Sequence, residues 1–197
     1  MEVLPLFPLH SILFPGCSLP LQIFEQRYLE LIKNTLKDNR TFGIVPIKHG
    51  SEVGGVGKKI PEIYMLGTEV EITDWTQLSN GLLGVTVSAK RRFRVCYVEA
   101  QPNQLLIGDI EFLDDESDML IPEALMELKE LREALLNHKG VEHFGLGELD
   151  DSLADLTWQL GQLLPVSDEK KVELLLVGAP EERALLLAEW LADLSGE

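Results

Sequence analysis

The fold of the first half of the chain is decided by residues 70–87, which read Val-Glu-Ile-Thr-Asp-Trp-Thr-Gln-Leu-Ser-Asn-Gly-Leu-Leu-Gly-Val-Thr-Val. The first part alternates with a period of two, as a half-buried strand does. The two predicted faces are Val70, Ile72 and Asp74 on one side, and Glu71, Thr73 and Trp75 on the other. Asn80-Gly81 supplies the positive φ values that a tight hairpin turn needs, and the run from Leu82 to Val87 predicts the returning strand.

Four further short runs outside this hairpin are rich in strand-forming residues and are separated by turn residues. They are Phe42–Ile47, Tyr64–Thr68, Phe93–Val98 and Leu105–Phe112, the last two joined across Pro102-Asn103. Several short strands with turns between them are typical of a sandwich or a small barrel. One helix is expected among them, because Tyr28, Leu31, Ile32 and Leu36 recur at helical spacing.

The periodicity becomes helical after Asp118. Pro122 fits the first turn of a helix that Gly140 can end. A second helix is capped by Asp151-Ser152, a third begins after Ser167 and ends at Gly178, and a fourth runs from Pro180 to about Leu194. The leucine stripes of the first two are Leu125, Leu128, Leu131, Leu135 and Leu136, and Leu153, Leu156, Leu160 and Leu163. The second half is therefore predicted to be a helical bundle.

The charge distribution supports a division of the chain into two parts. Residues 1–110 hold 11 basic and 11 acidic side chains, whereas residues 111–197 hold 6 basic and 22 acidic ones and so carry the whole net charge of -16. We predict a β-rich domain over residues 1–114 and an acidic helical subdomain over residues 118–197. Because an acidic module repels phosphate backbones, nucleic acid is not an expected partner.

The sequence lacks the signals of membrane-spanning and secreted proteins. No apolar run approaches the roughly 18 to 20 residues of a membrane span, and the N-terminus does not read as a secretory signal, so we expect a cytoplasmic protein without a membrane partner. The two cysteines, Cys17 and Cys96, are expected to be unpaired thiols.

Catalytic and cofactor motifs are missing as well. The glycine-rich run Gly50–Lys59 has neither Walker nor dinucleotide spacing and is predicted to be a flexible loop, and the sequence contains no G-x-S-x-G elbow. The histidines show no zinc-ligand spacing; they are His10, His49, His138 and His143. We expect no metal, no cofactor and no enzymatic activity.

The basic run Lys90–Arg94 is the exception to the neutral first half. In a strand, Arg91 and Phe93 would face one way and Arg92 and Arg94 the other, which divides the charge between two faces. This division weakens an RNA-binding interpretation without removing it.

Residues 4–28 carry a more specific signal. Leu4-Pro5-Leu6-Phe7-Pro8-Leu9, Leu13-Phe14-Pro15-Gly16 and Leu19–Tyr28 resemble the opening signature of the Lon protease N-terminal domain family, also called the Lon substrate-binding domain. Further similar motifs follow in the family's order: Phe42-Gly43-Ile44, Glu52-Val53-Gly54, Leu66-Gly67-Thr68, Asn80-Gly81 and Arg92-Phe93-Arg94. Leu82 departs from the pattern, since the family often has arginine there.

The resemblance implies an α+β fold, with an N-terminal twisted β pseudo-barrel of the PUA-like kind, one inserted helix and a C-terminal helical bundle subdomain. In Lon this domain captures protein substrates, and hydrolysis takes place elsewhere. Because the chain ends at Glu197 without an ATPase module or a Ser-Lys dyad, it resembles a stand-alone version of the domain. The function implied is binding of polypeptide segments or a protein partner without catalysis. The alternatives are RNA binding by the PUA-like sheet and peptidase activity.

Five residues are candidates for the binding site. Glu25 and Arg27 stand beside an apolar run and could pair with the strand of Arg92 and Arg94 in a structural polar network, or could line a peptide groove. Trp75 is expected to be partly exposed and to serve as an anchor for a peptide. The residues expected in the core or in turns are Leu4, Leu6, Phe7, Leu9, Phe14, Phe24, Trp158 and Trp190.

Overall fold

The structure, a computed structural model, describes residues 2–52, 59–114, 117–137, 145–146 and 148–195. It consists of two compact units. The β unit comprises Met1–Leu13 and Ser18–Leu113, and the helical unit comprises Phe14–Cys17 and Asp114–Glu197. The segment Phe14–Cys17 therefore belongs with the helices, which the predicted range of 1–114 for the β domain did not anticipate. No helix in the described part of the chain is long and apolar enough to cross a membrane.

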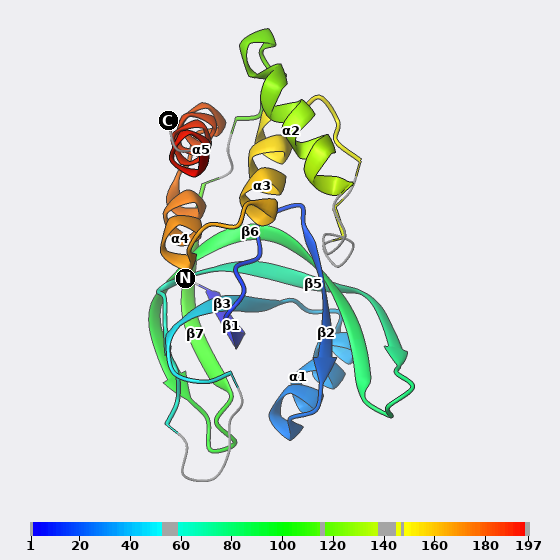
Figure 1. Cartoon of the computed structure of the whole chain (residues 1–197). Helices are drawn as coiled ribbons and strands as arrows, with labels where there is room; N and C mark the ends of the chain where they lie inside the picture. Colours follow the sequence, from blue (N-terminus) through cyan, green and yellow to red (C-terminus); the bar gives the residue numbers. More distant parts are fainter. Residues whose placement is uncertain (1, 53–58, 115–116, 138–144, 147, 196–197) are drawn as a thin grey trace. The chain divides into compact units, whose positions relative to one another are not determined.

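The described residues of the β unit form one helix and a seven-stranded sheet that closes on itself (Figure 1). The sheet order is β1-β7-β6-β5-β3, and β1 also pairs with β3 in parallel, so these five strands make a closed circuit. The elements are β1 (Glu2–Leu9), β2 (Ser18–Ile23), α1 (Gln26–Asp38), β3 (Phe42–His49), β4 (Glu62–Ile63), β5 (Leu66–Gln77), β6 (Leu83–Ala100) and β7 (Leu106–Phe112). The expected β pseudo-barrel with one inserted helix is confirmed.

Strand β6 is a single strand of 18 residues, so the expectation of two separate strands in this region was wrong. One edge of β6 pairs with β5, while the other pairs first with β2 and then with β7. Register shifts occur against both β5 and β7. Such bulges bend a strand and increase its twist, which lets one long strand serve three neighbours.

The core of the β unit is packed around Phe93, which is fully buried. Its ring lies against two glycines: a Cβ atom added to Gly43 or to Gly67 would approach the Phe93 Cζ atom to 2.5 or 2.7 Å. Only glycine allows the ring to come this close to the backbone of β3 and β5. The buried residues clustered with Phe93 are Leu4, Leu6, Val45, Ile63, Val95, Leu106 and Ile110.

The predicted helix near the N-terminus is α1. It buries Tyr28, Leu31 and Ile32 and ends at Asn39, which adopts the left-handed conformation of a C-cap. Phe24, which was expected in the core or in a turn, lies in the connection between β2 and this helix and is 54% exposed, so it is not a core residue. It follows the buried Ile23 and therefore points to the opposite side.

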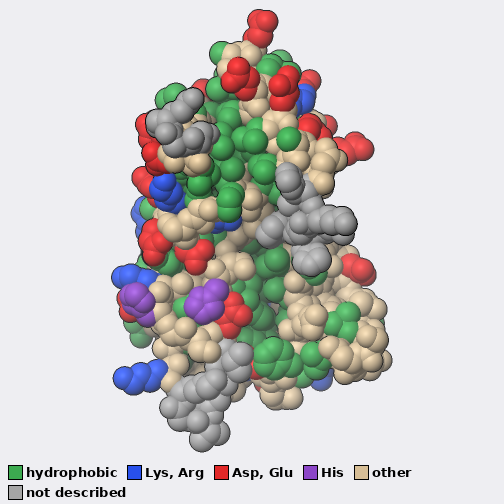
Figure 2. Space-filling model, viewed as in Figure 1, with side chains coloured by type: hydrophobic (Ala, Val, Ile, Leu, Met, Phe, Trp, Pro, Cys, Tyr) green, Lys and Arg blue, Asp and Glu red, His purple; other side chains and the backbone are tan. Residues whose placement is uncertain are grey.

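The helical unit contains the four predicted helices, which are α2 (Met126–Leu136), α3 (Leu153–Leu163), α4 (Asp168–Leu176) and α5 (Pro180–Ser195), with a 3-10 turn, η1 (Glu123–Leu125), before α2. Ser152 and Ser167 cap α3 and α4, since their side chains accept hydrogen bonds from backbone N–H groups of the first turns. Gly140 lies outside the described residues. Acidic side chains gather on the surface of this unit (Figure 2).

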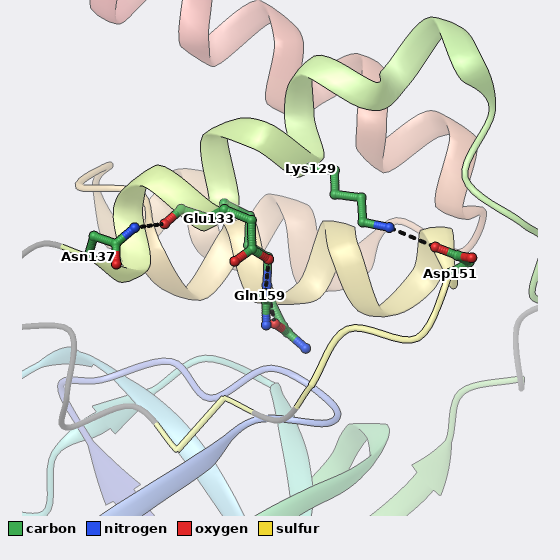
Figure 3. Close-up of polar contacts among 6 residues, drawn as sticks. Lys129, Glu133, Asn137, Asp151 and Gln159 are labelled. Carbon is green, nitrogen blue, oxygen red and sulfur yellow. Dashed lines mark hydrogen bonds and ion pairs between the residues drawn. The ribbon is translucent and has the colours of Figure 1, made fainter.

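Two buried arginines in the helical unit were not anticipated. Arg132 donates to the Gln159 side chain at 2.7 Å. Figure 3 shows Gln159 and the ion pair of Lys129 with Asp151. Arg183 is fully buried; it donates to Thr157 at 3.0 Å and its guanidinium lies 3.6 Å from the Trp158 ring centroid.

The segment Phe14–Cys17 completes the core of this unit. The Phe14 ring stacks on Trp158 with centroids 5.6 Å apart, and its N–H donates to Gln162. Trp158 and Trp190 are both buried, as expected.

Candidate functional site

A cavity of about 180 Å³ lies in the β unit where β2 ends and α1 begins. We call it the Phe24 pocket. Its lining residues are Phe7, Leu9, Pro20, Leu21, Gln22, Ile23, Phe24, Glu25, Tyr28 and Glu52. The pocket is mainly apolar, and its lining includes two carboxylates, those of Glu25 and Glu52.

The inner wall of the pocket is aromatic. Phe7 and Tyr28 stack with ring centroids 3.9 Å apart. Burial raises the pKa of the Tyr28 hydroxyl to about 12. The wall is therefore an uncharged surface at neutral pH, suited to an apolar ligand group.

Arg27 is held inside the β unit beside the pocket. Its side chain is 8% exposed and forms an ion pair with Glu25 at 3.0 Å. It also donates to the carbonyl oxygens of Gln104 at 2.8 Å and Glu52 at 3.4 Å, and its guanidinium lies 4.4 Å from the Tyr28 ring centroid. Its Nε has no hydrogen-bond partner among the described residues. Arg27 thus ties together the chain segments around the pocket, while Glu25 lies in the lining.

Trp75 is 61% exposed, as expected, but on a different face from the one predicted. Ile72 pairs with Val87 and Trp75 pairs with Val85, so β5 uses one residue more than β6 between these two pairs. This bulge changes the phase of the alternation and places Trp75 on the same face as Ile72, not with Glu71 and Thr73.

The same register connects Trp75 to the Phe24 pocket. Val85 pairs with Trp75 on β5 and with Leu21 on β2, and residues directly opposite in antiparallel strands share a face. Since neighbouring strands lie about 4.8 Å apart, Trp75 and Leu21 are roughly 10 Å apart across the sheet. Figure 2 shows hydrophobic side chains at the surface over β2 and the β5–β6 hairpin.

Arg92 and Arg94 line neither the Phe24 pocket nor the other cavity of the β unit described below. Arg92 is buried opposite Thr68, whereas Arg94 is exposed opposite Leu66. Arg92, Phe93 and Arg94 pair in unbroken register with Thr68, Gly67 and Leu66, so Arg92 and Arg94 share one face of β6 and Phe93 lies on the other, as predicted.

The neighbouring charges of the basic run are paired with carboxylates. Lys90 forms an ion pair with Glu71 at 2.5 Å, and Arg91 forms one with Glu69 at 2.9 Å. This arrangement does not favour the RNA-binding alternative, which needs free basic groups for phosphates.

Metal and loop predictions fall partly outside the described residues. Within the part of the chain that the structure describes, no group of three or more His, Cys, Asp or Glu side chains could hold a metal ion. His138, His143 and residues 53–58 of the predicted flexible loop are not described.

The family model of the ATP-dependent protease La (LON) substrate-binding domain matches residues 3–193 of this chain. The chain belongs to the Lon substrate-binding domain family. A crystal structure of a Lon N-terminal domain protein from Xanthomonas campestris resembles it with a TM-score of 0.74 and 28% identity, over 96% of this chain and 99% of that one.

Curated members of the Lon family show the same relationship. Lon protease of Cytophaga hutchinsonii is 28% identical over 68% of this chain, and Lon protease 1 of Bdellovibrio bacteriovorus is 25% identical over 96%. The chain spans only 16% and 24% of the lengths of these two relatives.

Of the five candidate residues, Glu25 lines the Phe24 pocket, Arg27 is buried beside it, and Trp75 lies on the same sheet face as Leu21, whereas Arg92 and Arg94 do not line the pocket. Sequence reasoning missed Phe24, Leu21 and Glu52. The signal for Phe24 was present, since it directly follows Ile23, the last inward-facing residue of β2. Glu52 stood in the family motif Glu52-Val53-Gly54, but nothing in that motif connected it to the pocket, which it reaches from a loop distant in the sequence.

Proposed function

We propose that this chain binds polypeptide segments through the Phe24 pocket and the exposed Trp75. The observation that carries the proposal is the position of Trp75 on the same sheet face as Leu21, which lines the pocket. Membership of a family described as a substrate-binding domain supports the same function.

The size of the pocket favours a side chain over a whole small molecule. Pockets that enclose drug-sized ligands measure roughly 300–1,000 Å³, whereas this one measures about 180 Å³. An apolar side chain of a polypeptide would occupy the pocket, and a neighbouring part of the same polypeptide would lie on Trp75.

The carboxylates define a preference in charge. Glu25 and Glu52 both line the pocket, and together with Arg27, which pairs with Glu25, they carry one net negative charge. A basic residue next to the inserted apolar side chain would be attracted to them, and an acidic one would be repelled. We therefore expect apolar segments with flanking lysine or arginine to bind more tightly than the same segments with flanking glutamate.

The test measures fluorescence anisotropy of labelled peptides that carry one leucine flanked by lysine in a Gly/Ser background. Truncating a central aromatic anchor commonly costs about 2 kcal/mol or more, which corresponds to roughly 30-fold in affinity. We expect Trp75→Ala and Phe24→Ala to lose about this much. The matched control is Tyr97→Ala, because Tyr97 is 58% exposed on β6 but lines neither cavity of the β unit.

Acrylamide quenching of tryptophan fluorescence provides a second readout. Trp158 and Trp190 are 4% and 3% exposed, so Trp75 dominates the quenching. Bound peptide should protect Trp75. Equal loss of affinity in Trp75→Ala and Tyr97→Ala, or no protection on binding, would refute the proposed surface.

We also propose that the chain binds without hydrolysis. Residues 50–59 lack Walker spacing, and the sequence has no G-x-S-x-G elbow. Purified protein should hydrolyse neither ATP nor unfolded casein above background. Turnover that survives repurification and disappears when a single Ser or Lys is changed would contradict this.

A further inference from the structure

Strand β2 has one open edge beside the Phe24 pocket. It pairs with β6 along Ser18–Ile23, and no other strand pairs with it in the described part of the chain. Four consecutive residues of β2, from Pro20 to Ile23, line the pocket. Because side chains of consecutive strand residues face opposite sides of a sheet, a cavity that contacts all four runs along the backbone of the strand. The pocket therefore lies along the open edge of β2.

Hydrogen bonds of the β5–β6 hairpin show which way the backbone groups of β6 point. The carbonyl oxygen of Thr86 accepts from the Thr73 hydroxyl at 3.2 Å, and that of Leu82 accepts from the Leu78 N–H at 2.9 Å. Both carbonyls therefore point toward β5. Backbone groups of successive strand residues point to alternate sides, so those of Val85 point toward β2.

This alternation identifies the residues of β2 that face the open edge. The pairing of β2 with β6 has no register shift. Leu21 lies opposite Val85 and so bonds to β6, whereas Ser18, Pro20 and Gln22 direct their backbone groups to the open edge. The position of Pro20 agrees with this, since a proline in a sheet occupies a site where the missing N–H would face away from the neighbouring strand.

The outward backbone groups of Pro20 and Gln22 are available to a ligand. Both residues are exposed, and these groups form no hydrogen bond with any residue that the structure describes. They comprise two acceptors, the carbonyl oxygens of Pro20 and Gln22, and one donor, the N–H of Gln22. Pro20 lacks a donor, and a proline of this kind protects an edge strand from pairing along its whole length. A short added segment can still form three hydrogen bonds beside the pocket.

We propose that the bound polypeptide is an extended segment that adds to the open edge of β2 as a short strand, a step that rests on the proposed function. Its backbone bonds to the outward groups of Pro20 and Gln22, which gives affinity that does not depend on its sequence. One apolar side chain, on the face that it shares with Leu21, enters the Phe24 pocket.

Charge and distance fit the same ligand. Glu25 pairs with Arg27, so Glu52 leaves the pocket with a net negative charge that complements a lysine beside the inserted side chain. The added strand would lie three strand spacings, or roughly 14 Å, from Trp75. About four further residues of an extended polypeptide cover this distance.

The test is an N-methyl scan of the lysine-flanked peptide with one leucine, measured by fluorescence anisotropy with the wild-type protein. Each N-methyl group removes one backbone donor of the peptide. Two residues near the leucine, separated by one residue, should each lose at least about fivefold in affinity when methylated, because their N–H groups donate to the Pro20 and Gln22 carbonyls. The residue between them should change by less than about twofold. This spacing holds for parallel and antiparallel addition.

Gln22→Pro tests the location on the protein. It removes the outward N–H and leaves the hydrogen bonds between β2 and β6 in place. Its matched variant is Gln22→Ala, which removes the side chain but keeps the N–H. Gln22→Pro should bind the peptide about two- to tenfold more weakly than Gln22→Ala. Thermal melts establish that both variants fold. In the wild-type protein, bound peptide should also slow hydrogen exchange of the Gln22 N–H, measured by NMR.

The outcomes separate the two proposals. If N-methylation has the same effect at every position, or if Gln22→Pro and Gln22→Ala bind alike and the exchange of the Gln22 N–H is unchanged, strand addition is refuted. Losses in Trp75→Ala and Phe24→Ala would then still support the proposed function. If no peptide binds, both proposals are refuted.

Discussion

Replacing Arg27 by methionine should destabilise the β unit strongly, because this arginine is a nearly buried cation. Methionine keeps the apolar packing of the side chain but removes the ion pair to Glu25 and the donors to Gln104 and Glu52. Removing one partner of a buried pair typically costs about 3–5 kcal/mol. The unpartnered Nε is removed as well, which returns about 1 kcal/mol. We expect a net loss of about 3 kcal/mol.

The assay is urea and thermal denaturation followed by circular dichroism. For a chain of 150–250 residues, 1 kcal/mol shifts Tm by about 2–4 °C, so Arg27→Met should melt about 6–12 °C below the wild type. The control is Arg94→Met, an exposed position on β6 where the change should stay within about 0.5 kcal/mol.

A double-mutant cycle with Glu25→Gln tests the ion pair itself. If the pair is as the structure shows, Glu25→Gln should cost less in the Arg27→Met background than alone, by about 0.5–3 kcal/mol. If Arg27→Met cost no more than Arg94→Met, the assignment of Arg27 as the residue that ties together the chain segments around the Phe24 pocket would be refuted.

Three further predictions concern other parts of the chain. Cys96 is exposed and should react rapidly with a thiol reagent, whereas Cys17 is buried with its pKa raised to about 12 by burial and should react only on unfolding; Cys96→Ser should abolish the rapid phase. Gly67→Ala should lower Tm by several degrees because the new Cβ would lie 2.5 Å from a carbonyl oxygen of β3, while Gly178→Ala, with no atom within 4 Å, should have little effect. Arg183→Met should lose about 3 kcal/mol in urea denaturation, because this fully buried guanidinium donates to the carbonyl oxygens at the end of α4; a loss below about 1 kcal/mol would contradict that role.

Local signals that fix the backbone were read correctly from the sequence. At the β5–β6 turn, Gly81 has a φ of 82°, as predicted, but Asn80 does not have a positive φ; its side chain instead accepts a hydrogen bond from the N–H of Leu82. The caps at Ser152 and Ser167 likewise act within one helical turn. Such signals need no knowledge of the rest of the fold, which is why the hairpin and helix starts could be predicted.

The face of the sheet on which a side chain lies could not be predicted from the sequence beyond a β-bulge. One extra residue between Ile72 and Asp74 reverses the faces of β5, so Trp75 was placed on the wrong side although its exposure was right. A second register shift lies between Thr68 and Val70, but it precedes Arg92 on β6 and leaves the alternation of Arg92, Phe93 and Arg94 as predicted. Bulges depend on the pairing of distant strands, and a single sequence does not mark them.

The strand character of β1 was also hidden, because prolines argue against strands. The structure explains how they are tolerated. Pro5 pairs only with β7 and Pro8 only with β3, so the strand changes partner between them and each proline has an open side. The missing N–H of a proline can face that side without loss of a ladder hydrogen bond. Pro5 itself lines a cavity of about 480 Å³ beside the C-terminal half of α1.

The change of partner along β1 also accounts for the presence of that pocket. A strand paired on both sides along its whole length would leave no space beside α1, but β1 pairs with β3 only from Leu6 onward. The space beside Val3, Leu4 and Pro5 is bounded instead by α1 and by the turn that Arg27 holds through Gln104. The proline that disguised the strand in the sequence therefore lies where the barrel opens, and the cavity beside it is a consequence of how the barrel closes.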